Sequence, residues 1–204
     1  MIKGIGFSLL GVVLTTSLMS VTSVRADDIY LGEPIYGGTG CPAGSAAAVL
    51  SPDSKSLSIL FDKYQAFAGG PSRQYYDRKS CNVAIPVHVP QGLSVSVLAV
   101  DYRGFNSVPR GGYSRFNVEY FFAGSRGPTY ARTFYGPVED GYFIRNNLQV
   151  NALVWSRCGD DVILRTNSSI FVKTNGYYDD ALSTVDSEDI NAGIKYLLQW
   201  RRCN

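Results

Sequence analysis

The chain has 204 residues, 45% of them hydrophobic, and its 19 basic and 17 acidic residues leave a formal net charge of +2. This near balance excludes the broad basic surface with which proteins bind nucleic acid or anionic lipid. A chain of this length buries about 70% of its unfolded surface, which is enough for one domain with its own hydrophobic core.

Residues 1–26 have the three-part layout of a secretory signal peptide, with Lys3 near the start, an apolar run, and a small-residue exit at Ala26. The run is too short and too rich in Gly, Ser and Thr to favour a permanent membrane span, which needs about 20 apolar residues. We expect no stable membrane insertion once the signal is removed. Lys3 and Arg25 leave with it, so 19 basic residues become 17, equal to the 17 acidic ones. Residues 27–204 are then a secreted domain, extracellular or periplasmic.

Short β-type runs alternate with turn residues along almost all of the remaining chain. Residues 46–50 and 57–61 flank a Ser-Pro-Asp-Ser-Lys turn and are predicted to form a hairpin. Residues 82–89 read as a strand in which Pro86 removes a hydrogen-bond donor, which favours a sheet edge or a bulge.

The following runs alternate apolar and polar side chains, the pattern of a strand with one buried face. In residues 115–122, for example, Phe116, Val118 and Tyr120 alternate with charged or amide side chains. Further strands are expected at residues 93–101, 129–135, 142–145, 148–155, 162–172 and 194–201. About ten strands without a convincing helix predict an all-β fold, a single antiparallel β-sandwich or jelly roll.

Two irregular loops are expected, at residues 69–74 and 103–112. Binding residues concentrate on loops that a rigid scaffold holds, and Tyr and Arg are favoured in contact surfaces. The second loop is therefore the candidate binding site, formed by Tyr102, Arg103, Phe105, Arg110 and Tyr113.

Four cysteines, Cys41, Cys81, Cys158 and Cys203, follow the signal peptide. An even number in an exported protein predicts two disulfides, and four cysteines allow three pairings. We prefer Cys41 with Cys81 and Cys158 with Cys203, because each bridge closes a loop of about 40 residues, but the crossed pairings stay open. Trp155 and Trp200 each precede a cysteine by three residues, so we expect at least one of these rings to pack near a bridge.

The stretch GGTGCPAGS at residues 37–45 invites other interpretations. A phosphate-binding loop needs a helix after it, commonly with a lysine, and here a strand follows. A thiol-redox motif needs a second cysteine where Gly44 lies. We interpret the stretch as a glycine turn that lets Cys41 reach its partner.

No catalytic residue is assigned. His88 is the one histidine, and no Gly-x-Ser-x-Gly motif presents a nucleophile to it. Carboxylates gather in predicted turns, where they suit either ordinary turn chemistry or calcium; they are Asp160, Asp161, Asp179, Asp180, Asp186, Glu188 and Asp189. We expect no metal site and no cofactor, with calcium as the alternative.

Several stretches resemble one family of small exported proteins, the domain-of-unknown-function family 4360. They are GGTGCPAGS (37–45), SLSILFDKYQA (56–66), RKSCNVAIPVHVPQGLSVSVLAVDYRG (78–104), VWSRCG (154–159), STVDS (183–187) and LLQWRRC (197–203). The resemblance implies export, a β-rich fold and paired cysteines, and it carries no catalytic residues.

The favoured function is a non-catalytic extracellular or cell-surface module, structural or binding an unknown protein or glycan. One alternative is a glycan-active hydrolase that uses two turn carboxylates. Another is a calcium-stabilised adhesin-like domain.

Overall fold

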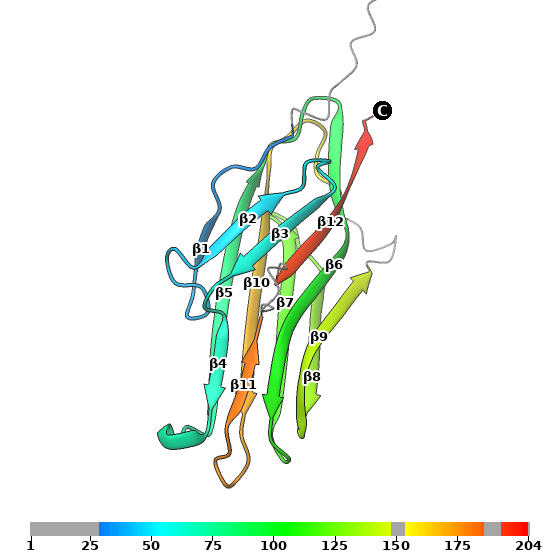
Figure 1. Cartoon of the computed structure of the whole chain (residues 1–204). Coiled ribbons are helices and arrows are strands. Elements are labelled where there is room, and N and C mark those ends of the chain that lie inside the picture. Colours follow the sequence, from blue (N-terminus) through cyan, green and yellow to red (C-terminus); the bar gives the residue numbers. More distant parts are fainter. Residues whose placement is uncertain (1–28, 148–153, 186–192, 204) are drawn as a thin grey trace, which may run out of the picture.

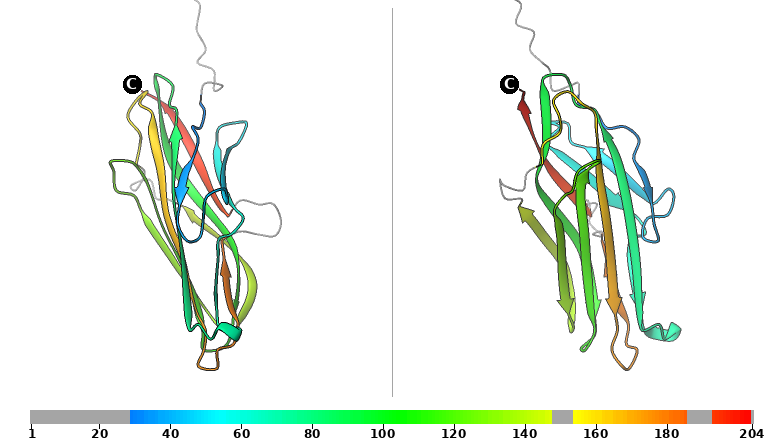
Figure 2. Two further views of the ribbon diagram at one scale, coloured as in Figure 1. Left: turned by 90° about the vertical axis from the view of Figure 1, so that its left-hand side faces the viewer. Right: turned by 180° about the vertical axis from the view of Figure 1, so that it is seen from behind.

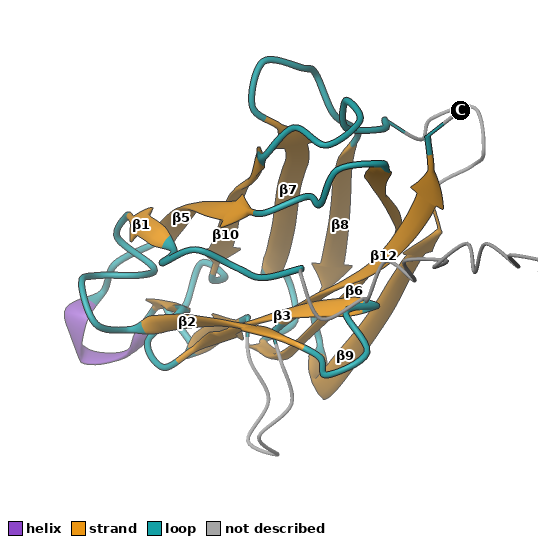
Figure 3. Ribbon diagram, turned by 90° about the horizontal axis from the view of Figure 1, so that it is seen from above, coloured by secondary structure: helices purple, strands orange, loops and turns teal. Residues whose placement is uncertain are grey.

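Two antiparallel sheets pack face to face around one core (Figures 1 and 3). The computed structural model describes residues 29–147, 154–185 and 193–203. One sheet has the strand order β1-β5-β10-β7-β8. The other has the order β2-β3-β12-β6-β11-β4, and β9 pairs with the opposite edge of β6. The predicted all-β sandwich is confirmed.

The first sheet is formed by β1 (Ile35–Gly37), β5 (Tyr76–Val87), β7 (Tyr113–Phe122), β8 (Thr129–Tyr135) and β10 (Val162–Lys173). The second is formed by β2 (Ala46–Leu50), β3 (Ser56–Phe61), β4 (Gln65–Ala68), β6 (Leu93–Val108), β9 (Val138–Asn147), β11 (Ala181–Thr184) and β12 (Ile194–Arg202). A short 3₁₀ turn, Gly70–Ser72, lies between β4 and β5. Within these described ranges, no helix has the length and apolar character needed to cross a membrane.

Period-two alternation places one face of each long strand in the core. In β7, Phe116, Val118 and Tyr120 are buried, as their spacing predicts, while Arg115 is exposed. The predicted hairpin is also confirmed, because β2 and β3 pair from Ala46 with Phe61 to Leu50 with Leu57. Local sequence pattern therefore accounts for these elements without reference to their distant partners.

The predicted loop at residues 103–112 is wrong, because β6 continues to Val108. Only residues 109–112 form the turn to β7. The strand continues because partners hold both of its edges, with β9 along residues 99–108 and β11 at Ser107 and Asn106. Gly104 suits this position, since a Cβ there would lie 2.1 Å from the carbonyl oxygen of Thr184.

The prediction that Pro86 marks a sheet edge or a bulge is also wrong, because the pairing of β5 with β10 runs through Pro86 and Ile163 without a break in register. Strand β5 is second in its sheet, between β1 and β10. However, β1 pairs only as far as Ala84, and the Pro86 carbonyl instead accepts a hydrogen bond from Gly32 at 2.8 Å. Pro86 thus lies past the end of β1, next to the isolated bridge between Leu31 and Val87.

Other predicted segments differ from the structure in their bounds, or lie outside its described part. The strand predicted at 142–145 is part of the longer β9, and β1, β4 and β11 were not predicted. Of the strand predicted at 148–155, residues 148–153 lie outside the described part, and Trp155 forms an isolated bridge with Ser96. The expected signal peptide lies outside it as well.

Both preferred disulfides are present, Cys41–Cys81 and Cys158–Cys203, with Cα–Cα distances of 5.4 and 5.9 Å. The first is fully buried, whereas Cys158 is exposed. Of the two tryptophans, Trp200 is partly buried against the core and donates a hydrogen bond to the Ser54 carbonyl at 2.8 Å. Trp155 lies beneath the guanidinium of Arg201, whose Cζ is 4.1 Å from the ring centroid.

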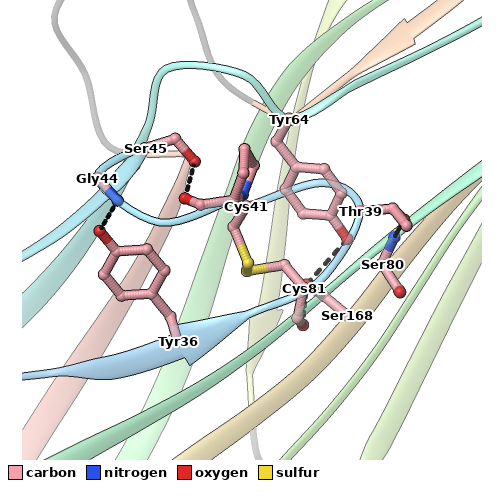
Figure 4. Close-up of a disulfide and its surroundings, with 10 residues drawn as sticks. Tyr36, Thr39, Cys41, Gly44, Ser45, Tyr64, Ser80, Cys81 and Ser168 are labelled. Carbon is pink, nitrogen blue, oxygen red and sulfur yellow. Dashed lines mark hydrogen bonds between the residues drawn. A yellow bond between two sulfur atoms is a disulfide. The ribbon is translucent and has the colours of Figure 1, made fainter.

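The glycine turn around Cys41 brings that residue against β5 (Figure 4). Gly38 has φ 149°, and a Cβ there would lie 2.1 Å from the Ser80 carbonyl oxygen. At Gly40 a Cβ would lie 2.3 Å from the ring of Tyr64, and its amide donates to the same Ser80 carbonyl at 2.8 Å. The stretch GGTGCPAGS is therefore a close-packed turn that carries a disulfide.

Candidate functional site

The structure separates the five residues of the predicted binding loop. Tyr102 is fully buried, with its ring 5.0 Å from that of Phe116, so it belongs to the core. Arg103 and Phe105 alternate with buried residues of β6 and lie on the outer face of the seven-stranded sheet. Arg110 lies in the turn after β6, and Tyr113 begins β7 on the opposite sheet. These residues do not form one surface.

The outer face of the five-stranded sheet instead gathers aromatic, cationic and amide side chains. The right-hand view of Figure 2 looks onto this sheet. Strands β5, β10, β7 and β8 lie in register there, so their outward side chains form rows across the sheet. From the β6–β7 turn inward, the rows are Tyr76-Lys173-Tyr113-Tyr135, Arg78-Phe171-Arg115-Thr133, Ser80-Ser169-Asn117-Ala131 and Asn82-Asn167-Glu119-Thr129.

Two shallow depressions, of about 720 and 420 Å³, lie along these rows. The larger is lined by Arg78, Tyr113, Arg115, Asn117, Thr133, Tyr135, Ser169 and Phe171. The smaller shares Arg78, Arg115, Asn117 and Ser169 with it and continues toward Asn82, Asn167 and Glu119. Because they share lining residues, the two are continuous. We call the surface formed by the four rows the sheet groove.

A line of aromatic rings crosses one end of the sheet groove. Phe171 stacks on Tyr76 at 5.9 Å between centroids, and its other neighbour is Tyr113 at 5.6 Å. Tyr135 continues the line 6.2 Å from Tyr113. The two end rings are exposed, Tyr76 by 59% and Tyr135 by 76%. Exposed rings at this density give the surface large apolar faces beside polar groups.

Three cations lie among these rings. Arg78 donates from Nη2 to Ser169 Oγ at 3.3 Å, and Arg115 donates from Nε to Asn117 Oδ1 at 3.1 Å. The Lys173 ammonium lies 5.8 Å from the Tyr113 ring centroid. Of the residues that line the two depressions, all in the described part of the chain, Glu119 supplies the one carboxylate. The groove is therefore polar with a positive bias.

Further aromatic residues lie near the same end of the sandwich. Tyr75 packs edge-on against Tyr178 at 5.9 Å, and Arg73 lies 4.8 Å from the Tyr178 ring centroid. Lys173 lies 5.0 Å from the ring of Tyr75 and so connects this cluster to the sheet groove. Tyr177, in the turn after β10, is 89% exposed.

Sequence reasoning identified Tyr113 but missed Arg78, Arg115 and Phe171 as members of one site. A signal was present in the alternation of Tyr76, Arg78, Ser80 and Asn82, which marks an exposed polar face on β5. The predicted strand begins only at residue 82, so it leaves out Tyr76, Arg78 and Ser80, which belong to β5. The juxtaposition of four strands was not visible from local pattern.

His88 directly follows β5, at the end of that strand away from Tyr76, and its contacts there are structural. Its Nδ1 lies 2.7 Å from Asp161 Oδ1, and its ring stacks on Tyr30 at 4.6 Å. The same carboxylate oxygen accepts the Val89 amide at 3.2 Å. The His88 side chain is 33% accessible and lies between buried Val87 and Val89.

The turn carboxylates are dispersed. Asp179 accepts a hydrogen bond from Asn175 Nδ2 at 2.7 Å, as a turn residue does. Asp186, Glu188 and Asp189 lie outside the described residues. Across the described ranges, no group of three or more His, Cys, Asp or Glu side chains is arranged to hold a metal ion. Calcium binding stays an untested alternative.

Comparison with known proteins places the chain in one family. A family model described as "Domain of unknown function (DUF4360)" matches residues 27–203. A protein of Arthroderma benhamiae described as an "Uncharacterized secreted protein" is 30% identical over 178 residues, which cover 87% of this chain and 73% of the relative. The resemblance inferred from the motifs and the secreted localisation are confirmed. Neither description names a ligand or an activity.

Proposed function

The chain belongs to the DUF4360 family of unknown function, and we propose that this secreted member is a non-catalytic module that binds a glycan in its sheet groove. The observation that carries the proposal is the line of rings from Tyr76 to Tyr135 beside rows of amide and hydroxyl side chains. The bound glycan would lie along the outer face of the five-stranded sheet.

Sugar chemistry suits this surface. A pyranose ring has an apolar face that stacks on an aromatic ring and an edge of hydroxyls that hydrogen-bond in both directions. The groove offers rings for the first contact. It offers Asn82, Asn117 and Asn167 for the second, since an amide both donates and accepts. The depression is open and shallow, which suits a chain lying across strands.

Binding is favoured over hydrolysis by the distribution of carboxylates. Glycoside hydrolases of the usual kind need two carboxyl groups about 5 to 10 Å apart on either side of the scissile bond. Among the described residues that line the groove, Glu119 has no such companion. It also accepts a hydrogen bond from Asn167 at 3.5 Å.

The test is a glycan array, followed by pull-down on insoluble polysaccharides, with the secreted protein in its oxidised form. We expect Tyr76→Ala and Tyr135→Ala each to weaken binding about fivefold, the loss of about 1 kcal/mol of stacking. Phe143→Ala is the matched control, because that ring is 52% exposed on the opposite sheet. Absence of binding to every glycan, or cleavage of one, would contradict the proposal.

A further inference from the structure

Two arginines flank an aromatic residue in the second row of the sheet groove. Arg78 on β5 and Arg115 on β7 both lie beside Phe171 of β10. Adjacent strands are about 4.8 Å apart, so the two arginines start from backbones about 10 Å apart. Both arginine side chains are exposed, and both line the larger depression.

These cations have no carboxylate partners within the described part of the chain. The ion pairs found there are Lys79–Asp77, His88–Asp161 and Arg145–Asp101. Arg78 and Arg115 each use one donor on a neutral side chain, whereas a guanidinium has five. Lys173, in the adjoining row, contacts rings rather than acids. The groove therefore holds positive charge that the fold itself does not neutralise.

We propose that the ligand is an acidic polysaccharide containing uronate sugars, and that Arg78 and Arg115 bind its carboxylates on either side of Phe171. This inference rests on the proposed function, since it names the class of glycan that the same groove takes. A planar guanidinium binds a carboxylate through two parallel hydrogen bonds. The Phe171 ring supports the apolar face of a sugar between the two charges.

The density of charge favours a uronate polymer over a more highly charged one. The groove mixes three cations with Glu119 and with many neutral amide and hydroxyl groups. Nucleic acids and heavily sulfated glycans are bound by surfaces with a dense array of Lys and Arg. This chain has 19 basic and 17 acidic residues, so it lacks the excess that such a surface needs.

Affinity electrophoresis of the oxidised, secreted protein tests the inference without any substitution. One gel contains polygalacturonate, and a second contains the same polymer with its carboxylates reduced to neutral hydroxymethyl groups. We expect at least tenfold weaker retardation by the reduced polymer, the loss of charge-assisted hydrogen bonds. Gels with dextran sulfate and with polyglutamate form the remaining arms.

The outcomes separate the two proposals. Equal binding to the charged and reduced polymers would overturn the uronate inference and leave glycan binding intact. Stronger binding to dextran sulfate or to polyglutamate would also overturn it, in favour of a sulfated or peptide ligand. Binding to no glycan in the gels or on the array would overturn both proposals.

Substitutions then locate the contact. Arg78→Gln and Arg115→Gln should each weaken polygalacturonate binding about tenfold, and Arg115→Lys should weaken it less, because it keeps the charge and loses the planar fork. Arg103→Gln is the control, since Arg103 lies over Phe143 on the opposite sheet. Binding is compared only for variants whose thermal unfolding midpoint is the same as that of the unsubstituted protein. If Arg103→Gln weakens binding as much as Arg115→Gln, the assignment to the groove is wrong.

Discussion

The hydroxyl of Tyr64 lies 3.0 Å from the hydroxyl of Ser168, a buried contact that joins the segment before β4 to the inner face of β10 (Figure 4). Ser168 Oγ also donates to the Cys81 carbonyl at 3.2 Å. The contact therefore links the two sheets next to the buried Cys41–Cys81 bridge. A buried polar group lowers the stability of the folded protein unless it makes a hydrogen bond, as these hydroxyls do.

Two tyrosine-to-phenylalanine variants should differ for this reason. Tyr64→Phe removes the partner of Ser168 and should lower the free energy of unfolding by about 1 kcal/mol. Tyr102→Phe should change it by less than about 0.5 kcal/mol, because the Tyr102 hydroxyl is buried without a hydrogen-bond partner in the described residues. Urea unfolding of both variants measures the difference. Equal losses in the two variants would contradict it.

Alkaline pH should unfold the protein. Burial raises the pKa of five tyrosines above the ordinary value of 10.0, that of Tyr120 to about 12; the others are Tyr64, Tyr102, Tyr142 and Tyr196. The unfolded chain releases these protons near pH 10 while the folded chain keeps them. The unfolded state then binds fewer protons, so the free energy of unfolding falls as pH rises above 10.

Urea titrations at intervals between about pH 8 and pH 12, with tyrosinate absorbance recorded in parallel, check this expectation. Below pH 10 the buried tyrosines should contribute no pH dependence. Above it, tyrosinate absorbance should rise together with unfolding, and Tyr64→Phe should make the decline less steep. An unfolding free energy that stays constant up to pH 12 would show that these side chains are not buried as described.

Two adjacent glycines should respond differently to alanine. Gly38 has φ 149°, and a Cβ there would meet the Ser80 carbonyl oxygen, whereas a Cβ at Gly37 would meet nothing within 4 Å. Gly38→Ala should destabilise the protein by more than about 2 kcal/mol, and Gly37→Ala should change its stability by less than about 0.5 kcal/mol. Thermal unfolding of the two oxidised variants measures both effects. A tolerant Gly38 would mean that the turn around Cys41 is not held against β5.

The two disulfides should be reduced in a defined order. Cys41 and Cys81 are fully buried, whereas Cys158 is exposed. Because thiol–disulfide exchange requires access to a sulfur, limiting reductant should open Cys158–Cys203 first. Alkylation followed by peptide mass spectrometry identifies the labelled pair.

Removal of either disulfide should lower the free energy of unfolding by a similar amount. The closed loops span 40 and 45 residues, so the chain-entropy model assigns about 4 kcal/mol to each. Double Cys→Ala variants of each pair, unfolded in urea, provide the comparison.

Simultaneous labelling of all four cysteines at limiting reductant would contradict the predicted order of reduction, and it would indicate that the buried bridge opens by global unfolding.

Much of the fold followed from local pattern. Alternation in residues 115–122 predicted which face of β7 is buried, and the Pro-Asp turn after Leu50 predicted the β2–β3 hairpin. These features depend on neighbours in the sequence, because a strand exposes alternate residues to opposite faces whatever its partner is. The continuation of β6 to Val108 did not follow, because it depends on pairing with β9 and β11.

The amino-acid sequence by itself determined the fold class, the burial of alternate residues and the supply of four cysteines for two bridges. Only the tertiary structure decided that Arg78, Phe171 and Arg115, from strands far apart in the chain, form one row while Tyr102 lies in the core. The physical reason is that sheet register is set by packing and hydrogen bonding between distant segments. The sequence of one segment predicts its own periodicity, but it does not predict which strand lies beside it.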